Sequence, residues 1–164
     1  MKNKTLAYIV VFMLMFLSFF GGSYFEKQKI KSSPAPVISP IQSQTVTEVS
    51  DGDTLKLSEG KTFRLYGINA PEVKEPFFEE AKAFTQNLVL GKQISIEQET
   101  NYKVDKFGRE LGYVFIDRVN LNIKLVRSGL ARVVLYDKRA KIKYQDELLS
   151  AEKEAKEKRL GVWK

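Results

Sequence analysis

A β-hairpin is encoded by Thr54-Leu-Lys-Leu-Ser-Glu-Gly-Lys-Thr-Phe-Arg-Leu-Tyr-Gly-Ile68, and the fold of the chain depends on this stretch. The first strand alternates leucine with polar residues, as expected for a strand with one buried face, and Ser58-Glu-Gly-Lys61 supplies a turn. The second strand, residues 62–68, is mostly apolar but contains Arg64. A guanidinium in such a strand needs water, a carboxylate or an anionic ligand as its partner.

Periodicity outside the hairpin predicts further strands and three helices. The folded domain is expected to begin near Thr45, with a first strand that ends at the Asp51-Gly52 turn. Further strands are predicted around 94–96, 111–116 and 132–136, and helices over 75–90, from about 120 to 128 and over 144–158. This order predicts a mainly β protein with α-helices (α+β), built as a small five-stranded barrel covered by about three helices. Such barrels often bind nucleic acid.

The first 44 residues differ in composition from the rest of the chain. Lys2 and Lys4 precede an uncharged apolar run over 6–25, which as a helix would span roughly 30 Å, the thickness of a bilayer core. This pattern predicts either a cleaved signal peptide or a retained membrane anchor over 1–25, and both readings stay open. Residues 26–44, rich in proline and serine, are expected to form a flexible linker before the folded domain, 45–164. We therefore expect an extracytoplasmic protein, secreted or tethered to the membrane.

Composition excludes several kinds of chemistry. The 164-residue chain contains no His and no Cys, which rules out zinc sites of those ligands, a Cys nucleophile, a Ser-His-Asp triad and disulfides. Any catalysis must therefore use carboxylates, cations, hydroxyls or a metal held by oxygen. The net charge is +7, but residues 1–45 carry 5 − 1 = +4, so the remainder carries only 22 − 19 = +3. The charge alone supports nucleic-acid binding by the folded part only weakly.

Two carboxylates follow the first predicted strand. Asp51 and Asp53 are two residues apart, so in an extended chain both would point to the same side and could share a calcium or magnesium ion. The alternative is that Asp51-Gly-Asp53 is only a polar turn between two strands.

Three charged residues and a set of aromatic residues are further candidates for catalysis or binding. Arg64 could grip a phosphate or form a structural ion pair. Glu72 follows Asn69-Ala-Pro71, where a constrained turn could aim it at a water near a metal, although it could equally be a surface carboxylate. Arg109 ends a charged loop with Gly108 and could reach a bound anion, or it could belong to a polar turn. The aromatic residues Phe107, Tyr113 and Tyr136 could stack on nucleobases, although we expect at least Tyr113 to pack in the core instead.

Taken together, three segments resemble the staphylococcal nuclease (thermonuclease-like) family: Asp51-Gly-Asp-Thr-Leu55, Arg64-Leu-Tyr-Gly-Ile-Asn-Ala-Pro-Glu72 and Asp105-Lys-Phe-Gly-Arg-Glu-Leu-Gly-Tyr-Val-Phe115. The similarity continues through Leu125-Val-Arg-Ser-Gly-Leu-Ala131 to Trp163. This resemblance implies an OB-fold barrel with three helices and calcium-dependent hydrolysis of phosphodiester bonds in DNA and RNA.

The resemblance also implies roles for single residues. It makes Asp53 a calcium ligand with Asp51 beside it, Arg64 and Arg109 the phosphate-binding arginines, and Glu72 the general base. The best-known family member has aspartate where this chain has Asn69, and threonine where it has Ala70. An asparagine oxygen can still bind calcium, but one negative charge is lost, so we expect weaker calcium binding. We expect loss of either arginine to affect turnover more than folding.

Two other classes of function remain open at this stage. The chain could be a catalytically inactive OB-fold module that binds nucleic acid, or a membrane-tethered interaction domain attached to anionic lipids. We expect a monomer in each case. Substitution of Glu72 separates the classes, since only an enzyme loses cleavage while it keeps binding.

Overall fold

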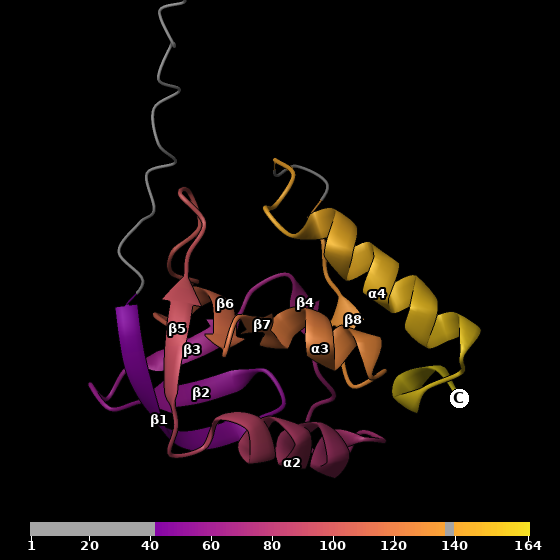
Figure 1. Cartoon of the computed structure of the whole chain (residues 1–164), viewed down its shortest axis with the longest axis horizontal. Coiled ribbons are helices and arrows are strands. Elements are labelled where there is room, and N and C mark those ends of the chain that lie inside the picture. The colour runs from indigo at the N-terminus through magenta and orange to yellow at the C-terminus, as the bar shows by residue number, and fades with distance from the viewer. Residues whose placement is uncertain (1–41, 137–139) are drawn as a thin grey trace, which may run out of the picture. The chain divides into compact units, whose positions relative to one another are not determined.

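The predicted hairpin forms one wall of a barrel in the computed structural model, which describes residues 42–136 and 140–164. β2 (Thr54–Leu57) pairs antiparallel with β3 (Thr62–Leu65). β1 (Gln42–Asp51) pairs with β2 and with β5 (Gln93–Glu97), and irregularities in its register let it serve both neighbours. β6 (Glu110–Ile116) pairs with β5 and, in parallel, with β3, which closes the barrel (Figure 1). The prediction of a five-stranded OB-fold barrel is confirmed.

Three helices cover the barrel in the described residues, as predicted. They are α2 (Phe78–Val89), α3 (Leu121–Arg127) and α4 (Gln145–Glu157). α2 packs against β1, whereas α4 packs on α3 (Figure 1). The inner face of α4 is buried at Leu148, Ala151 and Ala155. A short 3-10 helix, η1 (Gly161–Trp163), follows, and the short strands are β4 (Ile68–Asn69), β7 (Val119–Asn120) and β8 (Arg132–Val133).

Three strands and one helix differ from their predicted bounds. α2 begins at Phe78 rather than at residue 75, because residues 75–77 form a turn. β1 begins at Gln42 rather than near Thr45, because residues 43–45 pair with β5 although they lack an apolar alternation. The strand predicted over 62–68 is divided into β3 and β4 by a turn at Gly67, whose φ of 76° ends the extended conformation. The strand predicted over 132–136 is only β8, because its pairing with β4 extends over two residues.

A buried asparagine joins α3 to the closure of the barrel. Asn122 accepts a hydrogen bond from the Val114 N–H and donates to the carbonyl oxygens of Tyr66 and Gly112 at 2.9 and 3.2 Å. Gly112 lies in β6 opposite Leu65 of β3. The amide therefore satisfies backbone groups where the parallel pair ends, and it holds the start of β4 close to the barrel.

The predicted N-terminal apolar helix, 1–25, and nearly all of the predicted linker, 26–44, lie outside the described residues. Within the part of the chain that the structure describes, no helix combines the length and apolar character needed to span a membrane.

Candidate active site

The turn from Asp51 to Asp53 is held between α2 and the end of β4. A side chain at Gly52 would bring its Cβ to 2.7 Å from the Cβ of Ala70 and 2.8 Å from that of Ala81, so only glycine fits. Thr85 of α2 donates its hydroxyl hydrogen bond to the Gly52 carbonyl at 2.7 Å. The contacts with Ala70 and α2 thus fix a tight turn that places Asp53 beside the end of β4.

Asp53 is the buried acid of this site, with 3% of its surface exposed. Its Oδ2 accepts a hydrogen bond from the Ala70 N–H at 2.6 Å, and its Oδ1 forms an ion pair with Nη1 of Arg64. Nη2 of Arg64 donates to Oδ1 of Asn69 at 2.7 Å. The Asp53 and Asn69 oxygens therefore converge on one positively charged group.

Burial raises the pKa of Asp53 from its ordinary value of 3.8 to about 7. The nearby Arg64 guanidinium and the Ala70 N–H act in the opposite direction, since both stabilise the carboxylate. The Arg64 guanidinium therefore favours the ionised form of Asp53 and partly offsets the effect of burial on its pKa.

The predicted metal ligands differ in how they are oriented toward the position now held by the Arg64 guanidinium. Asp53 and Asn69 point to it together, whereas Asp51 turns back, and its Oδ1 accepts the Asp53 N–H at 3.0 Å. The described residues contain no group of three or more His, Cys, Asp and Glu that could hold a metal. A hard cation here would depend on the Asp53 carboxylate, the Asn69 amide oxygen and the nearby Ala70 carbonyl, with Asp51 beside them, a donor set that suits calcium chemically but carries little charge.

Arg109 is fixed by an acid that the sequence analysis did not assign to the site. Asp105 accepts the Nε hydrogen bond of Arg109 at 2.7 Å, and its other oxygen accepts the N–H groups of Phe107 and Arg109 at 2.8 and 3.0 Å. Although burial opposes ionisation, these hydrogen bonds and the Arg109 charge hold the pKa of Asp105 below its ordinary value. In the sequence, the i,i+4 spacing of Asp105 and Arg109 around Gly108 was the feature that could have predicted this ion pair.

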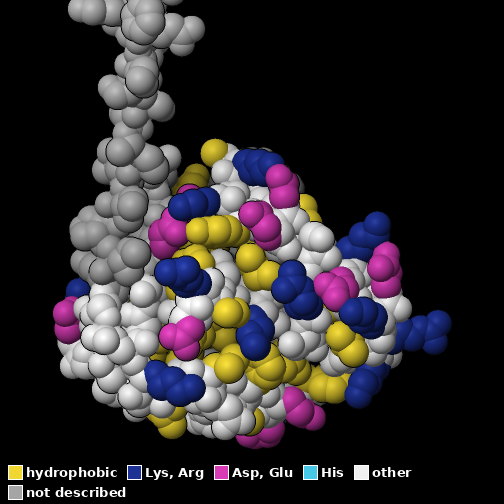
Figure 2. Space-filling model, in the orientation of Figure 1, with side chains coloured by type: hydrophobic (Ala, Val, Ile, Leu, Met, Phe, Trp, Pro, Cys, Tyr) yellow, Lys and Arg dark blue, Asp and Glu magenta, His cyan; other side chains and the backbone are white. Residues whose placement is uncertain are grey.

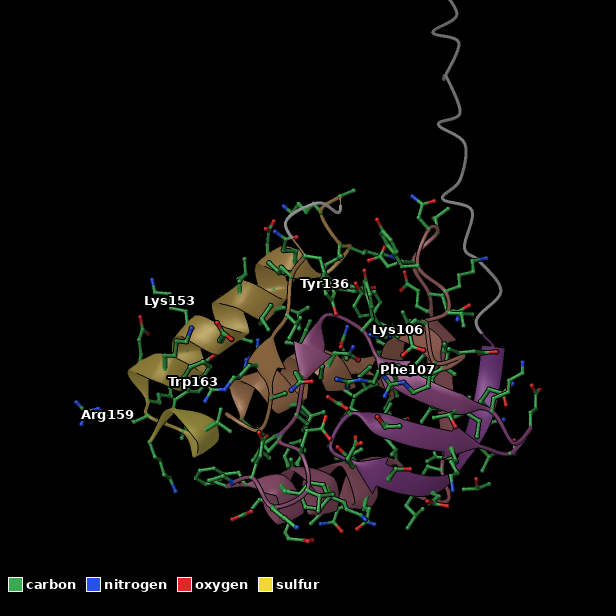
Figure 3. All side chains as sticks on the ribbon, turned by 180° about the vertical axis from the view of Figure 1, so that it is seen from behind. Lys106, Phe107, Tyr136, Lys153, Arg159 and Trp163 are labelled. Carbon is green, nitrogen blue, oxygen red and sulfur yellow. The ribbon has the colours of Figure 1, made fainter. Side chains whose placement is uncertain are left out.

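A pocket of about 390 Å³ brings several predicted residues together. We call it the main pocket; it is lined by Arg64, Asn69, Arg109, Phe107 and Tyr136, among others. Phe107 and Tyr136 are exposed, at 69% and 55%, and come from separate segments on the same side of the barrel (Figure 3). Tyr113 packs in the core, as expected, whereas Phe107 and Tyr136 do not. Their exposed rings leave flat apolar surface at the mouth of a basic pocket.

Glu72 lies in the exposed turn after β4, outside the residues that line the main pocket. Its backbone N–H donates to the Glu75 carboxylate at 2.8 Å, and its carbonyl accepts the Glu75 N–H. Two residues of this turn that are not glycine, Lys74 and Phe77, have positive φ angles of 75° and 69°. Such backbone conformations are costly and are often found near functional sites.

Among the described residues, the face opposite to the view of Figure 3 carries no continuous patch of positive or of negative charge. On the face shown in Figure 2, basic and acidic side chains are interspersed. Overall charge therefore does not locate a binding surface on this face, whereas basic and apolar side chains line pockets next to Asn69.

Comparison with known proteins agrees with this architecture. The family model described as "Staphylococcal nuclease homologue" matches residues 62–164. The thermonuclease of Staphylococcus hyicus is 33% identical over 131 residues, which cover 74% of this chain and 76% of that protein. The thermonuclease of Staphylococcus intermedius is 34% identical over the same shares of both chains. The SPbeta prophage-derived endonuclease YokF of Bacillus subtilis (strain 168) is 33% identical over 128 residues, which cover 73% of this chain and 43% of that protein. The chain belongs to the staphylococcal nuclease family.

Proposed function

We propose that this chain is an extracytoplasmic, calcium-dependent nuclease that hydrolyses phosphodiester bonds in DNA and/or RNA. The observation that carries the proposal is the convergence of Asp53 and Asn69 on one cationic group, at the edge of a pocket lined by Arg64 and Arg109. Membership of a family whose named relatives are nucleases supports it.

Asp53, Asn69 and the neighbouring Asp51 are the residues that would hold Ca²⁺. Their oxygens are the ligand type that calcium prefers, and Asp53 and Asn69 already face one positive charge. When bound, the cation would offset negative charge on the phosphate and make a nearby water easier to deprotonate.

The side chains of this chain divide the work of in-line hydrolysis. Glu72 accepts the proton of the attacking water, whose oxygen bonds to phosphorus as the bond to the leaving ester oxygen breaks, and that oxygen takes up a proton from solvent water. Arg109, whose Nε is held by Asp105, stabilises the additional charge on the phosphate oxygens. Arg64 supplies the second cation when the phosphate enters the main pocket.

Nucleobases are proposed to stack on the exposed rings of Phe107 and Tyr136. Lys106 and Arg109 lie 4.9 and 5.4 Å from the centre of the Phe107 ring, so a base on this ring stays close to cations that favour its phosphate. Stacking accepts any base, which suits a nuclease of broad sequence tolerance. We propose that the chain acts as a monomer.

The decisive experiment measures cleavage of single-stranded DNA and RNA by the purified chain, with calcium and with chelator. Glu72→Gln is compared with Glu79→Gln, which removes an exposed acid of α2 outside the site. We expect cleavage to require calcium and to fall at least about 100-fold in Glu72→Gln only.

Cutting that persists in chelator would refute the metal, and equal activity of the two glutamine variants would refute Glu72 as the base. Binding of the strand without cutting in any divalent metal would make the chain an inactive OB-fold binding module.

The proposed location rests on the N-terminal sequence, in which basic residues precede an apolar run over 6–25. Cell fractionation checks it. Nuclease activity in the medium or on the outer side of the membrane is expected, and activity confined to the cytoplasm would contradict it.

A further inference from the structure

A second pocket, of about 380 Å³, lies on the other side of Asn69 from the main pocket. We call it the side pocket; Asn69 is the residue that both pockets have in their linings. Cations and apolar surface face it together, from Arg132 and Lys164 and from Phe77, Pro76 and Val162. A ligand that crosses Asn69 can therefore enter both pockets.

The register of two short strands places Arg132 beside Asn69. β4 and β8 pair antiparallel with Asn69 directly opposite Arg132, and residues in such positions project on the same face of a sheet. The guanidinium lies over the Trp163 ring at 4.1 Å, and its Nη2 donates to the Val162 carbonyl at 3.1 Å. Since arginine has five N–H donors, the group is held in place and still has donors to offer a phosphate.

Lys164 reaches the side pocket because η1 docks on the turn after α3. Gly129 and Gly161 touch backbone to backbone, and the Val162 N–H donates to the Gly129 carbonyl at 2.9 Å. The Lys164 ammonium lies 5.5 Å from the centre of the Phe77 ring. Glu75 is the acidic residue of the lining, and its carboxylate accepts the Glu72 N–H. The side pocket thus combines two cations with apolar side chains. Its one acid, Glu75, is already hydrogen-bonded to the backbone of the neighbouring turn.

We propose that the side pocket binds the nucleotide on the opposite side of the scissile phosphate from the nucleotide in the main pocket. Arg132 and Lys164 bind the next phosphate of the strand, and Phe77 and Pro76 contact its sugar or base. This subsite rests on the proposed function, because Asn69 marks the position of the scissile phosphate. The substrate is then a strand of several nucleotides, held on both sides of the cut.

The single tryptophan gives a direct readout of this pocket. Trp163 lies between two residues of its lining, Val162 and Lys164, and contacts a third, Arg132. A thymidine tetranucleotide is titrated into the Glu72→Gln chain, and gel analysis verifies that the strand stays intact. We expect the emission of Trp163 to change on binding. We expect Lys164→Glu to weaken binding about fivefold, and Lys164→Ala to reduce the slope of log affinity against log salt by about 0.7, the loss of one single-strand phosphate contact.

The matched control is Lys153→Glu, which changes the net charge equally at a position on α4 outside both pockets (Figure 3). Lys106→Glu, in the main pocket, is expected to weaken binding yet keep the Trp163 response. An unresponsive Trp163, or equal weakening by Lys164→Glu and Lys153→Glu, would overturn the subsite. If the native chain binds and cuts the strand while Lys164→Glu and Lys153→Glu bind it equally well, only the subsite is refuted. If the native chain neither binds nor cuts the strand, the proposed function is refuted as well.

Discussion

Arg64 donates a hydrogen bond from Nη2 to the side-chain oxygen of Asn69 at 2.7 Å. The same guanidinium forms the ion pair with Asp53, so one arginine links two of the residues proposed as metal ligands. A neutral amide therefore stands where a second carboxylate would add charge, and the strength of cation binding should depend on this position.

Asn69→Asp should tighten calcium binding by about tenfold, or about 1.4 kcal/mol, because a second carboxylate then faces the cation. Isothermal titration calorimetry measures the change. Asn87→Asp, on the exposed surface of α2, adds the same charge outside the site and should leave the affinity unchanged. Equal affinities of Asn69→Asp and the native chain would count against Asn69 as a ligand.

Arg64→Ala should destabilise the fold by about 3 kcal/mol, because it leaves the buried Asp53 carboxylate without its partner. The sequence led us to expect a larger effect on turnover than on folding, and the ion pair changes that expectation for Arg64. Urea unfolding followed by Trp163 fluorescence measures the loss. Adding Asp53→Asn should recover part of it, and a double variant no more stable than Arg64→Ala would argue against the pair.

Gly52→Ala should cost about 2 kcal/mol and also weaken calcium binding, since its Cβ would push against Ala70 and Ala81 and displace Asp53. Gly60→Ala is the comparison. It has open space around it but a positive φ of 78°, so it should cost about 1 kcal/mol and leave calcium affinity intact. The result that contradicts this account is unchanged calcium affinity in Gly52→Ala.

Phe107→Ala and Tyr136→Ala should each raise KM for single-stranded DNA about tenfold, through loss of a stacking surface. Thermal unfolding should hardly change, because both rings are more than half exposed. Val119→Ala truncates another exposed apolar residue, at β7, and should alter neither quantity. If both rings can be removed without effect on KM, bases do not stack there.

Asp105→Asn should lower kcat about tenfold while KM changes less, because Arg109 loses the carboxylate that holds its Nε. The pKa of Asp105 is lowered in the folded chain, so the ion pair contributes above the ordinary value of 3.8 and is lost only as pH falls through the lowered pKa. The ratio of native to variant kcat should thus be constant from about pH 8 to about pH 5. A ratio that collapses within this range would show that Asp105 does not act as a carboxylate.

The sequence by itself determined the elements and the residue types of this protein. Alternation in the hairpin and helical spacing in residues 78–89 and 145–157 are local properties, because each follows from burying one face of a short segment. The absence of His and Cys limited the chemistry to oxygen ligands and arginines.

Only the tertiary structure decided which side chains meet. The partner of Arg64, the orientation of Asp105 and the place of Arg132 opposite Asn69 depend on pairings between distant segments. Closure of the barrel by β3 and β6 joins residues far apart in the chain, and no local preference specifies that contact. Packing of the whole barrel selects it, because only one register buries every apolar face at once.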